Sequence, residues 1–486
     1  MNFANDLLIG NPLRGNGWKK FFALTLVWMA TALLAPAQTV TTLHSYNLND
    51  GALPEFVTPA QGRDGDIYGT AFFGGSSTAC GAGCGTVFKV TPQGALSSVS
   101  FGVDGTEGAG PDAGLVLGPD GLLYGTTSSG GASGNGEVFS LNPKTKAITV
   151  LHSFNGSDGA SPDAPLTLGP GGKYYGTTSV GGSTNNGTVF SITRSGTFTS
   201  LHSFSGAEGA NPIGGGLTVG SDGALYGVTF FGGNGGSGRG TIFRITASGK
   251  LTTLYVFDGT NGAQPYGTLL LAADGNMYGT TSGDVTSGTV FKRTPAGVVT
   301  TLYTFGNGDT PEAGLVQATD GKLYGTTFFG GGFGNGQIFS IAISGTFTTL
   351  YMFPLSDGVD GQNPFGLMQH TNGKLYGVTN QGGTSNNCIF FDVPGCGTVF
   401  SFDVGLGPFV KFVVPDGKVG SVIQILGTGL TGATAVSFNG VPASSFKVIS
   451  DAFITATVPA GATTGRVRVA TPTGRLTSNV KFKVLR

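Results

Sequence analysis

Short apolar runs alternate with polar, glycine-rich turns along almost the whole chain. From Leu151 the sequence runs LHSF, NGSDGASPDAP, LTLGPGG, KYYGTTSVGG, STNNG and TVFSITRSGTFTS. The apolar runs are rich in β-branched and aromatic residues and are bounded by Gly, Asn, Asp or Pro, which is typical of strands joined by turns. After residue 37, no stretch keeps the i, i+3, i+4, i+7 spacing of an amphipathic helix. The pattern predicts an all-β protein.

This pattern repeats with a period near fifty residues. A Tyr-Gly pair recurs seven times, with gaps of 56, 51, 51, 52, 46 and 52 residues, at Tyr68, Tyr124, Tyr175, Tyr226, Tyr278, Tyr324 and Tyr376. Each repeat also has a turn pair such as Asp120-Gly121, which tolerates positive φ, and a later pair such as Val138-Phe139. Seven four-stranded units predict a seven-bladed β-propeller over residues 38–404, because radial closure hides the sheet edges.

The two ends of the repeat array indicate how the ring closes. The first strand, Val40 to Tyr46, is of the LHSF type, whereas the last, Val399 to Val404, is of the TVF type. If LHSF strands are outermost, the N-terminal strand completes the sheet formed by Leu367 to Val404. The alternative places LHSF innermost, with no sheet shared between the chain ends.

The repeat resembles a known bacterial family. Its unit, G-T-V-F-x-h-T-x-x-G-x-h-T-x-L-H-S-F…P…D-G-x-L-Y-G-T-T-x-x-G-G, is similar to the tandem repeat called GloVer (Gloeo/Verruco-type), frequent in secreted proteins, over residues 40–404. It is also similar, more distantly, to Kelch repeats, although the tryptophan of their blades is missing. The resemblance implies the repeat fold and carries no established activity.

After Phe400 the register stops and the composition changes at Gly405-Leu406-Gly407-Pro408. Residues 405–486 alternate apolar and polar positions over several short strands, which predicts a small β-sandwich. Their V-x-I-x-G-x-x-L and V-P-x-G-A-x-T-G-x-V-x-V segments are similar to the IPT/TIG immunoglobulin-like domain.

Charge limits the partners. The net charge is −1, and residues 1–37 carry +2 (Arg14, Lys19 and Lys20 against Asp6), so the remainder is −1 − (+2) = −3. A nucleic-acid-binding protein needs a basic stripe to neutralise phosphates, and none is present in this sequence. We expect a monomer that binds no nucleic acid and needs no cofactor.

The first 37 residues have the features of an export signal. Lys19-Lys20 precede the apolar run Phe21 to Leu34, and Ala35-Pro36-Ala37 offers small residues for cleavage. We predict a signal peptide over residues 1–37 and a mature chain without a membrane span that is secreted, periplasmic or at the cell surface. Two alternatives are a start codon further downstream and a leader retained as an anchor.

The cysteines fit an oxidising compartment. Cys80 and Cys84 lie in one loop of the first repeat, and Cys388 and Cys396 lie in the same loop of the seventh. An even number of cysteines in an exported chain favours disulfides, with Cys80–Cys84 and Cys388–Cys396 preferred because each pair shares a short loop. A Cys84–Cys396 link is possible if the first and seventh repeats are neighbours. C-x3-C and C-x7-C are not zinc spacings, and we expect no metal.

Candidate catalytic groups are weak. His44, His152 and His202 occupy a repeat position filled elsewhere by tyrosine, which favours a packing role with a polar tip, and His370 stands alone. The acidic residues fall in turns that explain them, so we nominate no catalytic residue; calcium in an Asp/Gly loop stays open.

Exposed aromatic residues are the remaining candidates for binding. Phe73, Phe231 and Phe329 each precede a Gly-Gly pair and should emerge beside the loops that hold Asp104, Asp158 and Glu208. The competing interpretation is that they only cover loops. We expect a non-enzymatic binding scaffold for an extracellular glycan or protein. The alternative is a polysaccharide-degrading hydrolase or lyase, which a pair of carboxylates converging at the central channel would favour.

Overall fold

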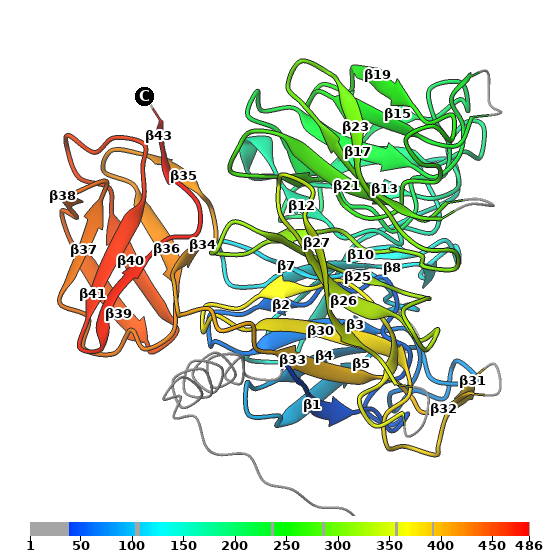
Figure 1. Cartoon of the computed structure of the whole chain (residues 1–486), viewed down its shortest axis with the longest axis horizontal. Coiled ribbons are helices and arrows are strands. Elements are labelled where there is room, and N and C mark those ends of the chain that lie inside the picture. Colours follow the sequence, from blue (N-terminus) through cyan, green and yellow to red (C-terminus); the bar gives the residue numbers. More distant parts are fainter. Residues whose placement is uncertain are drawn as a thin grey trace, which may run out of the picture. The chain divides into compact units, whose positions relative to one another are not determined.

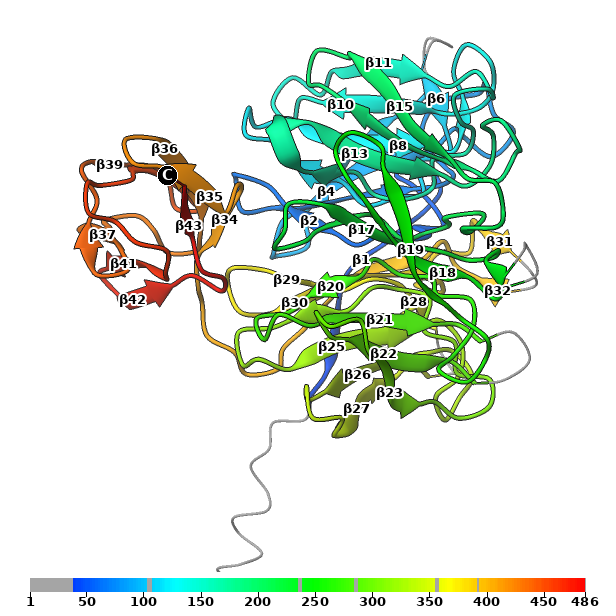
Figure 2. The same cartoon turned by 90° about the horizontal axis from the view of Figure 1, so that it is seen from above.

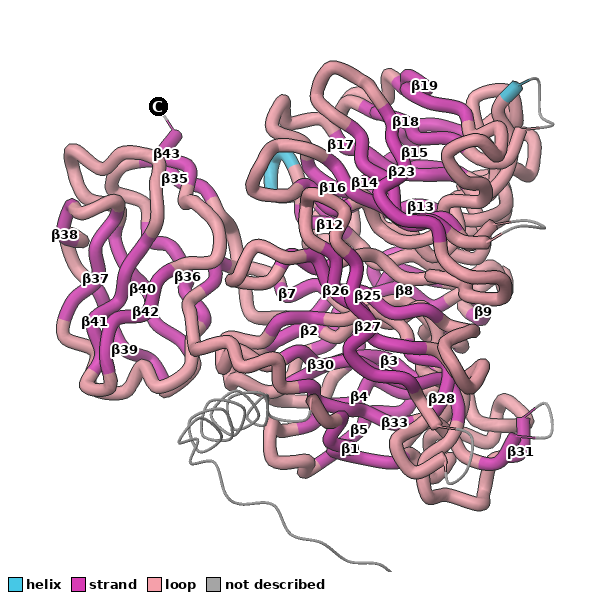
Figure 3. Tube along the Cα trace, in the orientation of Figure 1, coloured by secondary structure: helices cyan, strands magenta, loops and turns pink. Residues whose placement is uncertain are grey.

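The computed structural model describes residues 38–102, 107–234, 238–283, 287–354, 358–390 and 393–485. The predicted signal peptide, residues 1–37, lies outside the described residues. In the part described, regular structure is almost entirely β-strand, apart from single turns of 3-10 helix such as η1 (Pro170–Gly172) (Figures 1 and 3). The all-β prediction is confirmed.

The repeats form antiparallel sheets, each running from a two-residue strand at one edge to a strand of five or six residues at the other. The first three are β2 (Ala60–Gln61), β3 (Ile67–Ala71), β4 (Thr86–Val90) and β5 (Leu96–Ser100); β7 (Val116–Leu117), β8 (Leu123–Thr127), β10 (Glu137–Leu141) and β11 (Ile148–Ser153); and β12 (Thr167–Leu168), β13 (Tyr174–Thr178), β14 (Thr188–Ile192) and β15 (Phe198–Ser203). The next three are β16 (Thr218–Val219), β17 (Leu225–Thr229), β18 (Thr241–Ile245) and β19 (Leu251–Val256); β20 (Leu270–Leu271), β21 (Met277–Thr281), β22 (Thr289–Arg293) and β23 (Val299–Thr304); and β24 (Val316–Gln317), β25 (Leu323–Thr327), β26 (Gln337–Ile341) and β27 (Phe347–Met352). Strands β21, β22 and β23 can be followed side by side in Figure 2.

A seventh repeat sheet joins the two ends of the array. It contains β28 (Gln362–Pro364), β29 (Met368–Gln369), β30 (Leu375–Gln381), β33 (Thr398–Phe402) and, as its far edge, β1 (Val40–Ser45). Val40 pairs with Phe402 and Ser45 with Thr398, so the blue β1 lies beside the late strand β33 in Figure 1. The predicted sharing of one sheet between the chain ends is confirmed, and the alternative without a shared sheet is wrong.

The two-residue strands mark the edge at which neighbouring sheets converge. Thr167 in β12 donates its hydroxyl hydrogen to the Leu217 carbonyl oxygen of the next sheet, and Thr218 in β16 does the same to Leu269. The LHSF-type strands therefore lie at the opposite, outer edge. Four short strands in the connecting loops form two separate pairs, β6 (Gly108–Ala109) with β9 (Ser129–Gly130) and β31 (Ile389–Phe390) with β32 (Val393–Pro394).

One packing arrangement explains why Tyr-Gly and Val-Phe recur together. The glycine after each repeat tyrosine pairs across strands with the phenylalanine, as Gly176 does with Phe190. A Cβ on that glycine would lie within 2.7 Å of the Phe ring Cζ in all seven repeats. We call this pair the Gly/Phe lock. In five repeats the tyrosine hydroxyl donates to the turn aspartate, as Tyr124 does to Asp120 at 2.6 Å. In the third repeat Tyr175 donates to the Pro170 carbonyl oxygen, and in the seventh the Asn372 side chain donates to the Tyr376 hydroxyl, so the tyrosine of each repeat is tied to its turn.

Strands β34–β43, orange to red in Figures 1 and 2, pair among themselves. One sheet contains β34 (Lys411–Phe412), β36 (Val422–Leu426), β40 (Phe453–Thr457) and β39 (Phe446–Ser450); a second contains β38 (Val441–Pro442), β37 (Ala435–Phe438), β41 (Val467–Thr471) and β42 (Gly474–Thr477); and β35 (Asp416–Lys418) pairs with β43 (Lys483–Leu485). A separate apolar core, from Val410 to Phe482, fills the space between them.

Candidate functional site

A proline in each repeat positions one side chain at the converging edges of the sheets. The prolines pack against the glycine that precedes the TVF-type strand of the preceding sheet, as Pro111 does against Gly85 and Pro54 against Gly397. The residue after each proline starts the connection to the two-residue strand. These seven residues, which we call the axial ring, are Glu55, Asp112, Asp163, Ile213, Tyr266, Glu312 and Phe365.

A small cavity is lined in part by two residues of the axial ring, Glu312 and Phe365. Its lining comes from six repeats and consists of Phe56, Thr58, Pro165, Gly214, Thr268, Glu312, Ala313, Gly314, Phe365 and Gly366. Residues separated by up to about three hundred positions in the sequence therefore meet around one space. We call this cavity the axial pocket.

Of the four carboxylic acids of the axial ring, one is buried and three are half-buried. Asp112 is only 5% exposed, and burial together with the charge of Asp163 raises its pKa well above the usual range. Burial raises the pKa of Asp163 to about 7, and burial and the charge of Glu55 raise that of Glu312 to about 7. Burial also raises the pKa of Glu55, although a hydrogen bond from Asn380 at 2.7 Å opposes it. These shifts mean that removing a proton here places charge in a poorly solvated site.

Two of these carboxylates have an oxygen with no partner. Oδ1 of Asp112 and Oδ1 of Asp163 are shielded from solvent and accept no hydrogen bond from the described residues. Asp163 as a whole residue is only half-buried, so its orphaned atom is a local feature. Buried polar atoms of this kind are rare in native proteins and cost free energy unless a ligand or water satisfies them.

Two aromatic residues, Phe56 and Phe365, line the same cavity. The Phe56 ring lies 5.5 Å from that of Tyr266 and 5.4 Å from that of Phe365, measured between centroids. Phe230 packs behind Tyr266 and Phe328 behind Phe365. Phe56 has a φ of 49°, a left-handed conformation that is uncommon for a bulky residue. The contacts with Tyr266 and Phe365 hold its ring in place despite that local cost.

The predicted binding residues Phe73, Phe231 and Phe329 come from three different repeat sheets. They follow strands β3, β17 and β25, which belong to three non-consecutive sheets. Phe231 and Phe329 are 45% and 49% exposed, whereas Phe73 packs against a core cluster that includes Tyr46 and Phe88. Of the neighbouring loop residues, Asp104 lies outside the described residues. A role of the three rings in binding stays a prediction.

The repeat histidines support the loops of their own repeat. Nε2 of His152 lies 3.0 Å from Oδ2 of Asp158, and Nε2 of His202 lies 3.0 Å from Oε1 of Glu208. Each ring also packs edge-on against the phenylalanine two residues later. Tyr351 makes the equivalent hydrogen bond to Asp360, which explains the exchange of His for Tyr. His370 is buried, and its Nε2 lies 2.9 Å from the Gly65 carbonyl oxygen.

Both disulfides lie within single loops. Cys80 is bonded to Cys84 and Cys388 to Cys396, which are the pairs preferred from the sequence. Among the described residues, no group of three or more His, Cys, Asp or Glu side chains is arranged to hold a metal ion. No helix in the same residues is long and apolar enough to cross a membrane.

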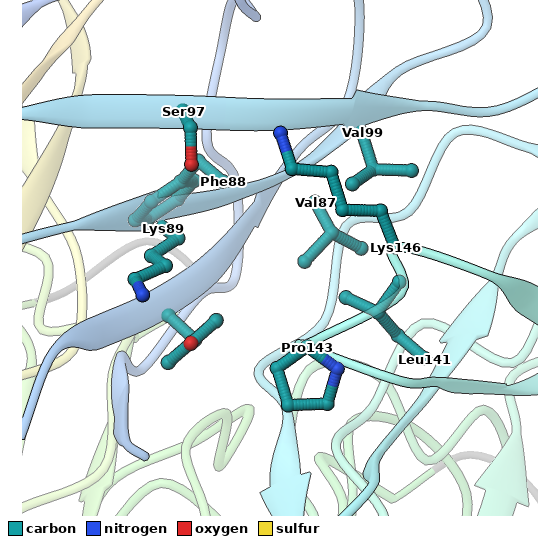
Figure 4. A pocket seen from close by; sticks show the side chains of 9 residues that line it. Val87, Phe88, Lys89, Ser97, Val99, Leu141, Pro143 and Lys146 are labelled. Atoms are coloured by element: carbon teal, nitrogen blue, oxygen red, sulfur yellow. The ribbon is translucent and has the colours of Figure 1, made fainter. Parts of the chain in front are cut away.

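A second small cavity lies between the first two repeat sheets (Figure 4). The LHSF-type strands of the other sheets carry a bulge at a leucine such as Leu151, but β5 pairs with β4 without a bulge. Lys146 and Pro143 from the next sheet lie over the resulting gap. The ammonium of Lys89 in its wall is already paired with Asp64 and Asp66, so this cavity has less chemistry to offer than the axial pocket.

Comparison with protein-family models gives two overlapping matches, at residues 31–219 and 196–391, to the Gloeobacter/Verrucomicrobia repeat. The chain belongs to this repeat family. A search of curated proteins finds no significant match.

Solved structures similar to this chain are propeller-like. Virginiamycin B lyase from Staphylococcus aureus superposes with a TM-score of 0.50 at 14% identity, covering 75% of this chain and 99% of that one. A fungal alcohol oxidase of the AA5 family, in complex with copper, superposes with a TM-score of 0.53 at 15% identity, covering 93% of this chain and 100% of that one. At such identities the likeness concerns the fold alone.

Sequence reasoning missed the axial ring. The sequence feature that could have revealed it is the position directly after the repeat proline. That position recurs in every repeat but holds residues of different chemistry, in order Glu, Asp, Asp, Ile, Tyr, Glu and Phe. Such variation conceals the shared repeat position, because the seven residues have no chemistry in common.

Proposed function

We propose that this protein is an extracellular binding protein whose seven repeat sheets are the blades of one closed β-propeller, with the ligand bound in the axial pocket. The expected ligand is a glycan or protein, of which a sugar unit or a side chain enters the pocket. Two disulfides within loops support an oxidising compartment, whether secreted, periplasmic or at the cell surface.

The observation that carries this proposal is a cavity lined by six repeats, with Glu312 and Phe365 of the axial ring in its wall. Concave sites that combine apolar walls with a few polar groups are typical of ligand pockets. The packing of the sheets does not require a carboxylate at this place, because Ile213 and Phe365 occupy the same repeat position.

Residues 405–486 are proposed to be an immunoglobulin-like domain that acts as a spacer or second contact. Arg63 of the first repeat donates to Oε1 of Gln424 at 2.7 Å and its guanidinium lies 4.9 Å from the Phe453 ring centroid. Thr371 and Thr428 lie within hydrogen-bonding distance at 2.9 Å. These contacts favour a domain that is docked on the repeats rather than freely tethered.

A second candidate function is hydrolysis or elimination on a polysaccharide. The pKa values of Asp163 and Glu312, both about 7, would allow a carboxylic acid to donate a proton near neutral pH while another carboxylate stays ionised. The enzyme alternative requires a pair of carboxylates that converge at the axis.

The test is a screen of glycans, peptides and polysaccharides with the mature chain and a variant whose pocket is filled. Thr58 is exposed and lines the axial pocket, so Thr58→Trp should abolish binding and leave the fold intact. The control is Thr199→Trp, an exposed position on the outer strand β15. Release of oligosaccharides would favour the enzyme, and binding that survives Thr58→Trp would move the site away from the axis.

A further inference from the structure

We propose that one sheet face of residues 405–486 binds a linear acidic polysaccharide. This inference deepens, and rests on, the proposed role of these residues as a second contact, and it is independent of the axial pocket.

The charge of the chain is divided unevenly between its two parts. Residues 405–486 contain nine Lys or Arg and two Asp, a net charge of 9 − 2 = +7, which leaves −3 − (+7) = −10 for residues 38–404. No acidic residue follows Asp451 in the sequence. The net charge of the whole chain conceals this division, so the expectation that no basic stripe is present is wrong for residues 405–486. A strongly basic part of an acidic chain indicates an anionic partner for that part.

Two arginines lie on the outer side of the neighbouring strands β41 and β42 (Figure 2). Val467, Val469 and Leu476 belong to the apolar core between the sheets. Side chains alternate between the two faces of a strand, so Arg468 on β41 and Arg475 on β42 point away from the core, and both are exposed.

A third arginine and a lysine continue this side of the sheet. Gly465 pairs with Phe482, whose ring is buried in the same core. The residues next to this pair, Arg466 and Lys481, therefore lie opposite one another on the outer side. We call the four outward cations the basic face: Arg466, Arg468, Arg475 and Lys481.

The basic face has no carboxylate partner among the described residues, because the ion pairs found there all join groups of residues 38–404. Arg466 donates to the Ser478 carbonyl oxygen. The side-chain contacts with the repeats come from Gln424, Phe453 and Thr428, on or beside the other sheet. The basic face is thus a set of unpaired like charges, and a chain of anions relieves their repulsion.

Three observations favour a polysaccharide among the polyanions. Ser437 and Thr477 flank Arg468 on the two adjacent strands, so hydroxyl groups that can bond a sugar lie between the cations. Residues 405–486 contain no Tyr or Trp and their phenylalanines are buried or half-buried, whereas single-stranded nucleic acids are held by rings that stack on bases. The two disulfides indicate an oxidising compartment, outside the cytosol. Guanidinium groups bind the carboxylates of such a chain with two parallel hydrogen bonds.

The experiment is isothermal titration calorimetry of the full mature chain at physiological ionic strength. The probes are polygalacturonate, dextran sulfate, neutral dextran and a double-stranded DNA oligonucleotide. The first two distinguish carboxylate from sulfate as the source of the anion, and neutral dextran isolates the contribution of charge.

The test variant combines Arg468→Gln with Arg475→Gln, and the matched control combines Lys418→Gln with Lys447→Gln. The two lysines are exposed on β35 and β39, so both variants have the same net charge and differ only in where charge is removed. Thermal melting establishes that each variant is folded.

We expect at least one acidic polysaccharide to bind, neutral dextran not to bind, and added salt to weaken the complex. The arginine variant should bind at least about fivefold more weakly than the parent, the worth of two exposed ion pairs, and the lysine variant within about twofold of it. Thr58→Trp should leave this binding unchanged.

The inference is overturned if neither acidic polysaccharide binds, if both double variants lose affinity equally, or if the DNA binds more tightly than either polysaccharide. A dimer of the parent that the arginine variant dissociates in analytical ultracentrifugation would assign the basic face to the acidic repeats of a second copy, and would also overturn it. When Thr58→Trp abolishes binding of other ligands and no acidic polysaccharide binds, only this inference fails and the axial proposal survives. When acidic polysaccharides bind through the basic face and no ligand responds to Thr58→Trp, the axial proposal alone fails.

Discussion

The Gly/Phe lock and the axial ring recur once per repeat, yet they differ in how much the seven copies vary. Every lock has the same glycine and the same phenylalanine, because the ring occupies the space that a Cβ would need. The axial ring holds acids in four copies and Ile, Tyr or Phe in the other three. Where neighbours fill all the space around a residue, packing decides its type; beside a cavity, its chemistry is free to serve a ligand.

The comparison assumes that the sheets form one closed body, and removing β1 tests this most severely. Deletion of residues 40–46 removes the partner of β33 together with Tyr46, which is fully buried. An unpaired edge and an opened core should lower the melting temperature of the whole repeat region by at least about 5 °C. Differential scanning calorimetry measures this. A control lacking only the exposed residues 38 and 39 should melt like the parent, and an unchanged melting temperature for the longer deletion would refute shared closure.

Substitution of the glycine in a Gly/Phe lock should have the next largest effect on stability. In Gly176→Val the new Cβ would lie 2.5 Å from Cζ of Phe190 and 2.8 Å from Cδ2 of Leu166, so the sheet must shift. Overpacking of a filled core should cost about 3 kcal/mol or more of unfolding free energy. The matched control is Gly407→Val, where a Cβ meets no atom within 4 Å. Urea denaturation compares the two; equal stability would show that packing does not preserve the glycine.

At the axial ring the expected effect on the unfolding free energy has the opposite sign. Asp163→Asn should stabilise the protein. Folding raises the pKa of Asp163 to about 7, so the folded chain holds this proton more tightly than the unfolded chain, in which the pKa is near 4. The cost of ionising it in the fold is absent below about pH 4, grows up to about pH 7 and is constant above. The variant should exceed the parent by roughly 1 to 3 kcal/mol at pH 8 and match it at pH 4.

Urea denaturation at several pH values tests this, with Asp403→Asn as the exposed control. A gain that persists undiminished at pH 4 would mean that the charge of Asp163 is not its source.

This contrast also explains what could be predicted from the sequence. The sheets could be predicted, because Tyr-Gly, the turn pair and Val-Phe recur in a fixed register. The pairing of β1 with β33 followed from the types of the first and last strands of the repeat array. The axial ring could not be predicted, because its residues share a repeat position but no residue type. The aromatic candidates Phe73, Phe231 and Phe329 were chosen by the opposite criterion, similarity between repeats, and that criterion selects packing at least as readily as binding.

The smallest effect concerns these phenylalanines, which divide into two kinds. Phe231 and Phe329 are about half exposed, and each packs edge-on against the phenylalanine that precedes it. Phe73 has the same local contact with Phe72 but also packs against a core cluster. Phe231→Ser and Phe329→Ser should therefore each cost at most about 1 kcal/mol of unfolding free energy, and Phe73→Ser more, because it uncovers buried apolar surface. Urea denaturation ranks the three. If the Phe231 and Phe329 variants keep the stability of the parent and also bind every ligand of the axial pocket unchanged, these rings have no share in that site; a selective loss of affinity would place the binding surface across the loops as well as at the axis.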